Sequence, residues 1–340
     1  MADVALTPTS SLTAQRAVPT SSLGTISARV FAWFMVSSAL VYSFNLYLTY
    51  GLGWASVLEL WEGRTDSPLA WVQLASYVLC LALPAAYVLS TRDRPLRAEN
   101  RTITSIVTFL LRFAFWAVVL VGIVDFVISF LRVEQLLATL VGPQLAVDLG
   151  RSAYRGVVVH MPLIGLALVL AVVTRGLGFI WLGLLIVVAE LVIVFTRFVF
   201  FYEQAFQADL VRFWHAALFL FASAYTLTEE GHVRVDVFYA GLRQETKGVI
   251  NFIGTILLGL FFCWVVLWLG TWTRSATIVG PFMSFEVTQS AFGLYVKYWM
   301  AMFLGLFLVT MIIQFAGYML EALADWRGDP GHVDHVDSMH

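Results

Sequence analysis

Charged residues are scarce in this chain. Asp, Glu, Lys and Arg make up 12% of its 340 residues, and the formal net charge is only −2. The 20 basic residues stand singly and form no continuous basic face of the kind that nucleic acid binding requires. The sequence therefore excludes a nucleic-acid-binding protein.

Cysteine is also scarce, and motifs that carry catalysis are missing. Cys80 and Cys263 lie in apolar stretches far apart in the sequence, without the Cys-x-x-Cys or Cys/His spacing typical of a metal site. We interpret both as small apolar residues. Because the sequence holds no Ser/His/Asp arrangement, Walker-type loop or Gly-rich phosphate loop, it predicts neither an enzyme nor a bound cofactor.

Apolar residues are abundant. They account for 60% of the chain, and the mean hydropathy is +0.84. About 20 apolar residues of helix cross a bilayer core about 30 Å thick. Since the apolar runs are continuous and not alternating, we expect an all-α, polytopic membrane protein and not a barrel. About eight runs reach the required length, at residues 29–52, 68–90, 103–131, 156–174, 177–199, 209–228, 249–272 and 292–320.

Polar segments flank these runs. Residues 1–28 are rich in Ser, Thr, Ala and Pro, which predicts a disordered tail, and the first apolar run is too long for a cleavable signal peptide. Residues 326–340 predict a second disordered tail, whose histidines are better explained by a solvated segment than by a metal site. Between Val133 and Asp148, apolar residues at helical spacing, broken at Gly142-Pro143, predict a short interfacial helix.

The distribution of arginine predicts the orientation of the chain. The connection from Thr91 to Arg101 is rich in arginine, whereas the preceding connection, near residues 54–66, is mainly acidic. The positive-inside rule places the arginine-rich connection in the cytoplasm. Counting spans from that point predicts that both termini are cytoplasmic.

Three ionisable residues lie within the predicted spans, namely Arg112, Asp125 and Glu190. Charges at this depth are expensive and are candidates for function. Arg112 and Asp125 lie on one predicted helix but more than about 100° apart around its axis, so we do not expect them to pair. Two roles remain open for all three: polar contacts between helices or with a neighbouring subunit, or a place on a substrate or ion path.

Two histidines lie near the predicted periplasmic ends of different spans. His160 and His215 are at similar predicted depth, so two imidazoles could hold a haem iron between helices. The alternative is that each is a hydrogen-bonded polar residue in a contact between helices.

The most informative stretch runs from Glu229 to Asp236 and reads Glu-Glu-Gly-His-Val-Arg-Val-Asp. It separates two apolar runs at the predicted cytoplasmic face. Gly231, His232, Arg234 and Asp236 match the Gly-His-hydrophobic-Arg-hydrophobic-Asp stretch of the small permease subunits of tripartite ATP-independent periplasmic (TRAP) transporters. On this motif the region resembles that family.

Weaker similarities extend the resemblance over residues 177–325. They include the end of the family's first span, the start of its second and the last span of the subgroup labelled for mannitol or chloroaromatic compounds. The matching residues are Arg197, followed by Phe198, Val199 and Phe200, then Asp209 and Arg212, and finally Lys297, Gly305 and Gln314. Residues 29–174 form an additional four-span region that lies outside the resemblance.

The resemblance implies a non-enzymatic subunit of a secondary transporter in the bacterial inner membrane. In such a transporter a periplasmic binding protein captures an organic acid and delivers it to a large permease, which imports it by sodium-coupled symport. The small subunit is expected to be a scaffold for the large permease. Two alternatives remain, a haem-bearing redox subunit, and a channel, receptor or stand-alone transporter built on the intramembrane charges.

Overall fold

The computed structural model describes residues 22–176, 179–228, 239, 241–287 and 293–331. These residues form helices, with short π-helical turns labelled η, and contain no strand. The elements are, in chain order, α1 (Leu23–Leu46), η1 (Tyr47–Gly51), α2 (Val57–Trp61), α3 (Pro68–Ser90), α4 (Leu96–Val133), α5 (Leu137–Val141), α6 (Pro143–Leu149), α7 (Ser152–Arg155), η2 (Gly156–His160), α8 (Met161–Val173), α9 (Phe179–Val199), α10 (Ala205–Thr228), α11 (Gln244–Gly254), η3 (Thr255–Leu260), α12 (Phe261–Thr271), α13 (Val279–Met283) and α14 (Lys297–Arg327).

Eight helical stretches among the described residues are long and apolar enough to cross a bilayer. They confirm the prediction of an all-α, multi-pass membrane protein. The stretches are Leu23–Gly51, Pro68–Ser90, Leu96–Val133, Ser152–Val173, Ile180–Val199, Ala205–Leu227, Gln244–Thr271 and Lys297–Arg327.

Several spans are longer than their apolar runs predict. The first helix begins at Leu23, inside the segment expected to be disordered, because Ser22 caps it by accepting the Thr25 N–H at 3.3 Å. Helix α4 begins at Leu96 instead of 103, and α14 continues to Arg327 instead of ending near 320. Polar residues at these ends are helical because their side chains find partners on neighbouring helices, a contribution that hydropathy does not measure.

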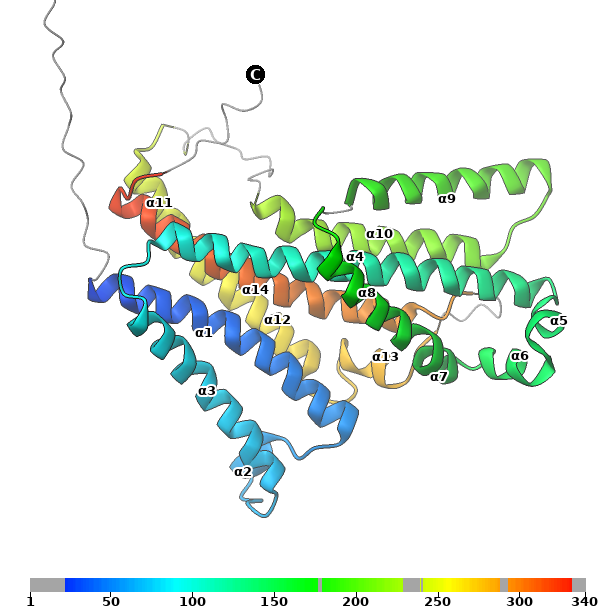
Figure 1. Ribbon diagram of the computed structural model, residues 1–340, viewed down its shortest axis with the longest axis horizontal. Coiled ribbons are helices and arrows are strands. Elements are labelled where there is room, and N and C mark those ends of the chain that lie inside the picture. The colour runs from blue at the N-terminus through cyan, green and yellow to red at the C-terminus, as the bar shows by residue number, and fades with distance from the viewer. Residues whose placement is uncertain (1–21, 177–178, 229–238, 240, 288–292, 332–340) are drawn as a thin grey trace, which may run out of the picture.

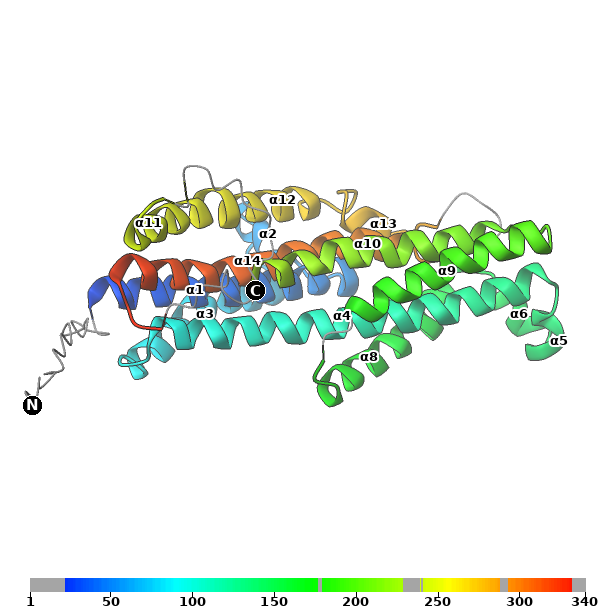
Figure 2. The ribbon, with the colours of Figure 1, turned by 90° about the horizontal axis from the view of Figure 1, so that it is seen from above.

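Helices α4 and α14 form the centre of the molecule. Figures 1 and 2 show α4 running along its length, with α1, α3 and α11 toward one end and the turn between α9 and α10 at the other. Helix α4 packs against α8, α10 and α14, while α14 also packs against α1, α10 and α11. The α14 side chains of Ile312, Ile313, Ala316 and Leu320 are completely buried. The first four spans and the last four therefore share one core.

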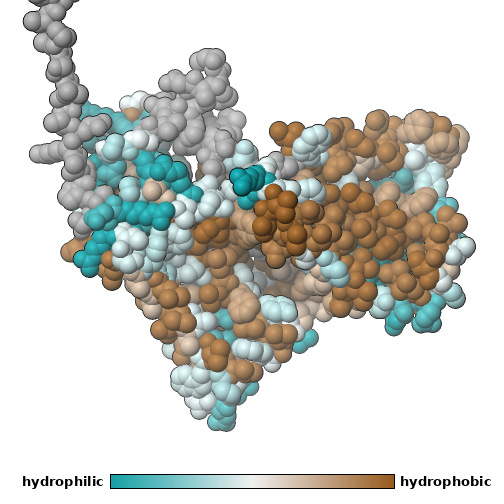
Figure 3. All heavy atoms as spheres, in the orientation of Figure 1, coloured by the Kyte–Doolittle hydropathy of each residue, from teal (hydrophilic) through white to brown (hydrophobic). Residues whose placement is uncertain are grey.

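Helix α9 lies at the margin of this core. It packs against α10 and only lightly against α4. Figure 3 shows apolar surface over α8, α9 and α10, and hydrophilic surface at the end where α1 and α4 begin and over the tips formed by α2 and by α5 and α6. An apolar exposed surface of this extent fits a bilayer or a partner within it.

The predicted break at Gly142-Pro143 is present. Helix α5 ends before Gly142, whose φ of +88° is open to glycine but not to most other residues, and Pro143 is the first residue of α6. The segment from Val133 to Asp148 therefore holds two short helices where we expected one interrupted helix.

Candidate functional site

Asp125 of α4 is a buried carboxylate that contacts several elements of the core. Its Oδ1 accepts hydrogen bonds from Arg155 Nη1 at 2.9 Å and His160 Nε2 at 3.1 Å. Its Oδ2 accepts one from the backbone N–H of Tyr295 at 2.7 Å. All three ionisable side chains, those of Asp125, Arg155 and His160, are completely buried. Asp125 thus joins α4 to α7, η2 and the segment that leads into α14.

Arg155 compensates the Asp125 charge and extends the network. Its Nε donates to the Leu149 carbonyl at 2.9 Å, Nη1 also reaches Ser129 Oγ at 3.2 Å, and the guanidinium lies 4.1 Å from the ring centroid of Tyr295. A buried ion pair is held together strongly once formed, because removing one partner leaves an uncompensated charge, at a cost of about 3–5 kcal/mol. The pair therefore fixes the entry of the fourth span against the third.

His160 completes the connection to α14. Its Nδ1 lies 3.1 Å from the indole nitrogen of Trp299, which can only donate, and 2.6 Å from the Tyr298 hydroxyl. An accepting Nδ1 assigns the proton to Nε2, which then donates to Asp125. We call Asp125, Arg155, His160, Tyr295, Tyr298 and Trp299 the junction cluster. It connects the third, fourth and last spans through side chains with complementary donors and acceptors.

A second carboxylate holds the same segment before α14. Asp209 of α10 accepts the Leu294 N–H through Oδ2 at 3.1 Å, next to the Tyr295 N–H that binds Asp125. Leu294, Tyr295 and Val296 are buried. Arg212, three residues after Asp209, lies 3.3 Å from its Oδ1, and most of the Arg212 side chain is exposed. Adjacent backbone donors are therefore tied to α4 and to α10.

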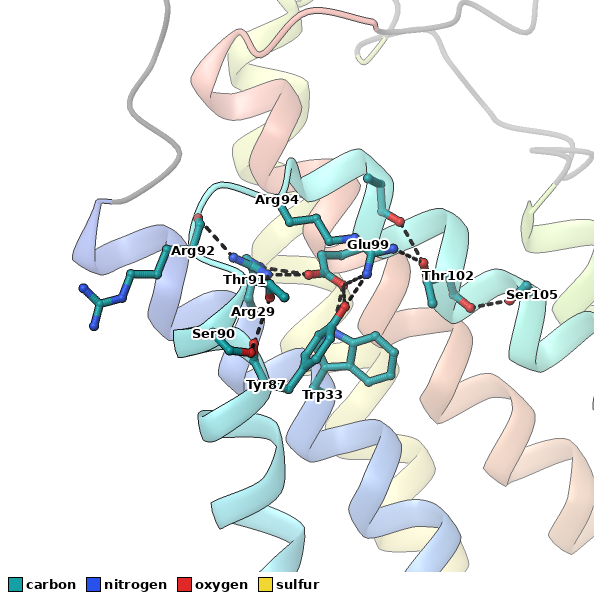
Figure 4. Close-up of polar contacts among 11 residues, drawn as sticks. Arg29, Trp33, Tyr87, Ser90, Thr91, Arg92, Arg94, Glu99, Thr102 and Ser105 are labelled. Carbon is teal, nitrogen blue, oxygen red and sulfur yellow. Dashed lines mark hydrogen bonds and ion pairs between the residues drawn. The ribbon is translucent and has the colours of Figure 1, made fainter.

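Arg29 and Glu99 form a second buried ion pair at the opposite end of α4, with an N–O distance of 2.5 Å and no exposed side-chain surface. Glu99 also accepts from Trp33 Nε1 at 2.9 Å and from the Tyr87 hydroxyl at 3.3 Å. Arg29 donates further to Thr91 Oγ1 at 2.8 Å. Figure 4 shows these side chains converging on Glu99 from α1, α3 and α4. An ion pair and several hydrogen bonds thus connect the first three spans at this end.

The same end connects α4 to α14. Arg97 donates to Asp325 Oδ1 at 2.8 Å and pairs with Glu321, which also accepts from Asn100 at 3.0 Å. Arg327 of α14 donates to Thr25 of α1. The outer ends of the first and last spans therefore lie together, as an even number of spans requires.

The remaining predicted intramembrane residues are not brought together. Arg112 donates to the Thr174 carbonyl at 2.5 Å and does not pair with Asp125. Glu190 and His215 are exposed, and neither has a hydrogen-bond or ion-pair partner among the described residues. The three intramembrane charges line no common path in the described part of the chain.

The haem alternative finds little support in this geometry. Both ring nitrogens of His160 take part in hydrogen bonds, whereas His215 is exposed on α10. Because α10 begins at Ala205, four residues earlier than expected, His215 lies near the middle of its span and not near its end. A haem iron needs a ring nitrogen that is free to coordinate.

The residues that carry the family resemblance have diverse surroundings. Gly231, His232, Arg234 and Asp236 lie outside the described residues. Arg197 forms an exposed ion pair with Glu203 at 3.4 Å, and Lys297 pairs with Glu286. Gln314 is buried in α14, and its Oε1 has no hydrogen-bond partner in the described ranges.

Sequence reasoning missed Arg155, Arg29 and Glu99. Each lies near the end of an apolar run, where a charge is normally assigned to the interface, so hydropathy alone gave no reason to select it. A signal was available for Glu99, because it is an acidic residue within an arginine-rich connection.

Helical spans joined through buried charges define a multi-pass membrane protein. Comparison with known families gives a match for the C-terminal part of the chain. The family of tripartite ATP-independent periplasmic transporters, DctQ component, matches residues 184–325. This segment covers α10 to α13 and most of α9 and α14. The family that it matches is a component of tripartite transporters. No curated protein and no solved structure matches the chain. The residues before 184 lie outside the family match.

Proposed function

We propose that this chain is the small membrane subunit of a TRAP-type transporter in a bacterial inner membrane. In this proposal it is a static scaffold for a large permease, which imports an organic acid by ion-coupled symport after a periplasmic protein has delivered it. The observation that carries the proposal is the family match over residues 184–325. The similarity of Lys297 and Gln314 to the mannitol or chloroaromatic subgroup makes that subgroup the first to test.

The contacts of the core support a scaffold role. The charges of Asp125 and Glu99 are compensated by Arg155 and Arg29 within the same chain. Paired and buried groups of this kind favour one rigid arrangement of helices, and they are not accessible to a substrate. Within the proposal, therefore, substrate recognition belongs to the large permease and the binding protein.

The four N-terminal spans have a corresponding place in the proposal. Residues 29–174 enlarge the scaffold by packing on the family region of residues 177–325, and the hydrogen bonds from Asp125 to the Tyr295 N–H and from Arg97 to Asp325 support this role. We also propose that they contact the large permease. Helix packing of this kind requires no binding cavity.

The function is tested by co-expressing the chain with a candidate large permease and binding protein encoded beside it. We expect the chain and the permease to co-purify, and reconstituted vesicles to accumulate an organic acid only when all three components and an ion gradient are present. Uptake by the permease and binding protein at full rate without this chain would contradict the proposal, as would uptake by this chain alone.

The orientation is tested separately with reporter fusions. We expect a reporter after Arg327 to report the cytoplasm and one within residues 55–66 to report the periplasm. Seven of the eight candidate spans among the described residues lie between the two positions, and an odd number of spans puts the two reporters on opposite sides. Reporters on the same side would therefore contradict the proposed topology.

The motif residues His232, Arg234 and Asp236 are proposed to serve assembly. Alanine replacements should lower the amount of assembled complex more than the transport rate of each complex that forms. Full assembly with abolished transport would instead assign these residues a direct part in transport.

A further inference from the structure

The outer surface of the α9–α10 hairpin carries polar groups at a depth where lipid would not stabilise them. Glu190 lies eleven residues after Phe179 in a helix that ends at Val199, so it lies about 17 Å from the start of α9 and close to mid-span. Its side chain is exposed and has no hydrogen-bond or ion-pair partner among the described residues. A carboxylate facing hydrocarbon is expensive, so a partner is expected in the assembled state.

His215 lies at the same level on the neighbouring helix. The turn between the helices covers residues 200–204, and Glu190 precedes Val199 by nine residues while His215 follows Ala205 by ten. In an antiparallel hairpin these positions lie opposite each other. His215 is exposed as well, so two polar groups occupy the same depth of the outer surface.

Helical geometry places both residues on the same side of the hairpin. An apolar groove of about 220 Å³ lies between α4, α9 and α10, and its lining includes Val188 and Val192 of α9 and Leu210 and Trp214 of α10. From the centre of that lining, Glu190 is turned by about 130° around α9 and His215 by about 110° around α10. In both helices this rotation about the helix axis passes the side that contacts the other helix. Glu190 and His215 therefore flank the seam on the face opposite the groove.

The polar surface continues along α10. Arg212, Phe219 and Ser223 recur with His215 at spacings of three and four residues, which places them on one helical face. The side chain of Arg212 is 71% exposed and the Phe219 residue is 74% exposed. The face thus combines an aromatic side chain with groups of both charge types, a composition that suits a protein partner better than acyl chains.

We propose that Glu190, Arg212, His215 and Phe219 form the docking face for the large permease subunit within the membrane. This inference rests on the proposed function and specifies its surface. Charge complementarity determines the chemistry of the partner helix. It presents a cationic or hydroxyl donor to Glu190, an acceptor to Arg212 one turn nearer the hairpin turn, and an apolar pocket to Phe219.

The test compares Glu190→Leu and His215→Leu with Glu203→Gln in the full chain co-expressed with the large permease. Glu203 belongs to the same hairpin but lies in its exposed turn, where it pairs with Arg197. We expect each leucine variant to lower co-purified permease about tenfold or more, because a charged or polar partner is then left unsatisfied. The control should retain the wild-type amount. The melting temperature of the isolated leucine variants should not fall, since leucine is compatible with lipid.

Cross-linking identifies the occupant of the face. The native thiols of Cys80 and Cys263 are buried, so a Phe219→Cys variant adds an accessible one, and Val172→Cys on α8 is the matched control at an exposed position outside the face. We expect the cysteine at 219, but not that at 172, to cross-link to the large permease. Cross-linking to a second copy of this chain, or to neither protein, would overturn the inference.

The outcomes separate this inference from the proposed function. Leucine variants that retain the permease at the wild-type level would overturn the docking face and leave the function standing. A wild-type chain that retains no large permease would instead contradict the proposed function.

Discussion

The α4–α14 core and the α9–α10 hairpin use intramembrane charge in opposite ways. In the core, Asp125 and Glu99 are buried and compensated by arginines of the same chain. On the hairpin, Glu190 and His215 are exposed at mid-span, without a partner among the described residues. A charged residue in an apolar run can therefore have either of two roles. Where the charge is satisfied internally it fixes the fold, and where it is not, it points to a partner outside the chain.

Deleting residues 1–174 should give the largest effect. The deletion removes α4, against which α8, α10 and α14 pack, and both carboxylates that anchor the two buried ion pairs. We expect the amount of assembled complex to fall severely, while the substrate preference of the complex that still forms is unchanged. Co-purification and competition uptake assays measure the two quantities.

The opposite result would redefine the N-terminal spans. If the truncated subunit assembled fully but the transported substrate changed, these spans would select substrate and would not be an extension of the scaffold. If both quantities were unchanged, the shared core seen in the packing of α4 on α14 would have no part in assembly.

Replacing Asp125 should give the largest effect of any single substitution. In Asp125→Asn the Arg155 charge loses its counter-ion in a fully buried site, so we expect a loss of about 3–5 kcal/mol, seen as a lower melting temperature in detergent. Asp148→Asn is the matched control, because its ion-pair partner Arg151 is 65% exposed, and it should cost less than about 1 kcal/mol. Similar melting temperatures for both variants would contradict the distinction between buried and exposed pairs.

The sequence predicted the spans well because long apolar runs have few alternatives to membrane helices. It also predicted the break at Gly142-Pro143, where the residues themselves restrict the backbone. It did not predict which helices are neighbours. Arg155 pairs with Asp125, 30 residues away, and Glu99 pairs with Arg29, 70 residues away. No local sequence pattern predicts contacts between residues so far apart. The motif from Gly231 to Asp236 carries the family resemblance, and it lies outside the described residues.

The Arg29–Glu99 pair allows a sharper test of what a buried pair contributes. Glu99→Leu alone should destabilise the chain by about 3 kcal/mol or more, because Arg29 remains buried and charged. The double variant Arg29→Met, Glu99→Leu should recover more than half of this loss, since an apolar pair requires no counter-ion. Melting temperatures of the single and double variants measure the coupling. A double variant as unstable as Glu99→Leu would show that Trp33 and Tyr87, which also donate to Glu99, carry most of the effect.

The smallest effect is expected at the turn of the hairpin, where Tyr202 donates to Glu134 at 2.6 Å. This hydrogen bond joins the α9–α10 turn to the end of α4. Because it is exposed, Tyr202→Phe should cost less than about 1 kcal/mol in detergent. Partial burial and the bond to Glu134 raise the pKa of Tyr202 to about 12, above the value of about 10 for an unfolded tyrosine.

The direction of that shift predicts the pH dependence. The contribution of Tyr202 is complete below pH 10, where the hydroxyl is neutral in both the folded and the unfolded chain, and it is lost as the pH rises toward 12. Wild-type and Tyr202→Phe chains should therefore differ by a constant small amount between pH 6 and 9. A loss above about 2 kcal/mol, or one that varies within this range, would mean that the turn is integral to the core. Helix α9 could then no longer be treated as an element at the margin of the core.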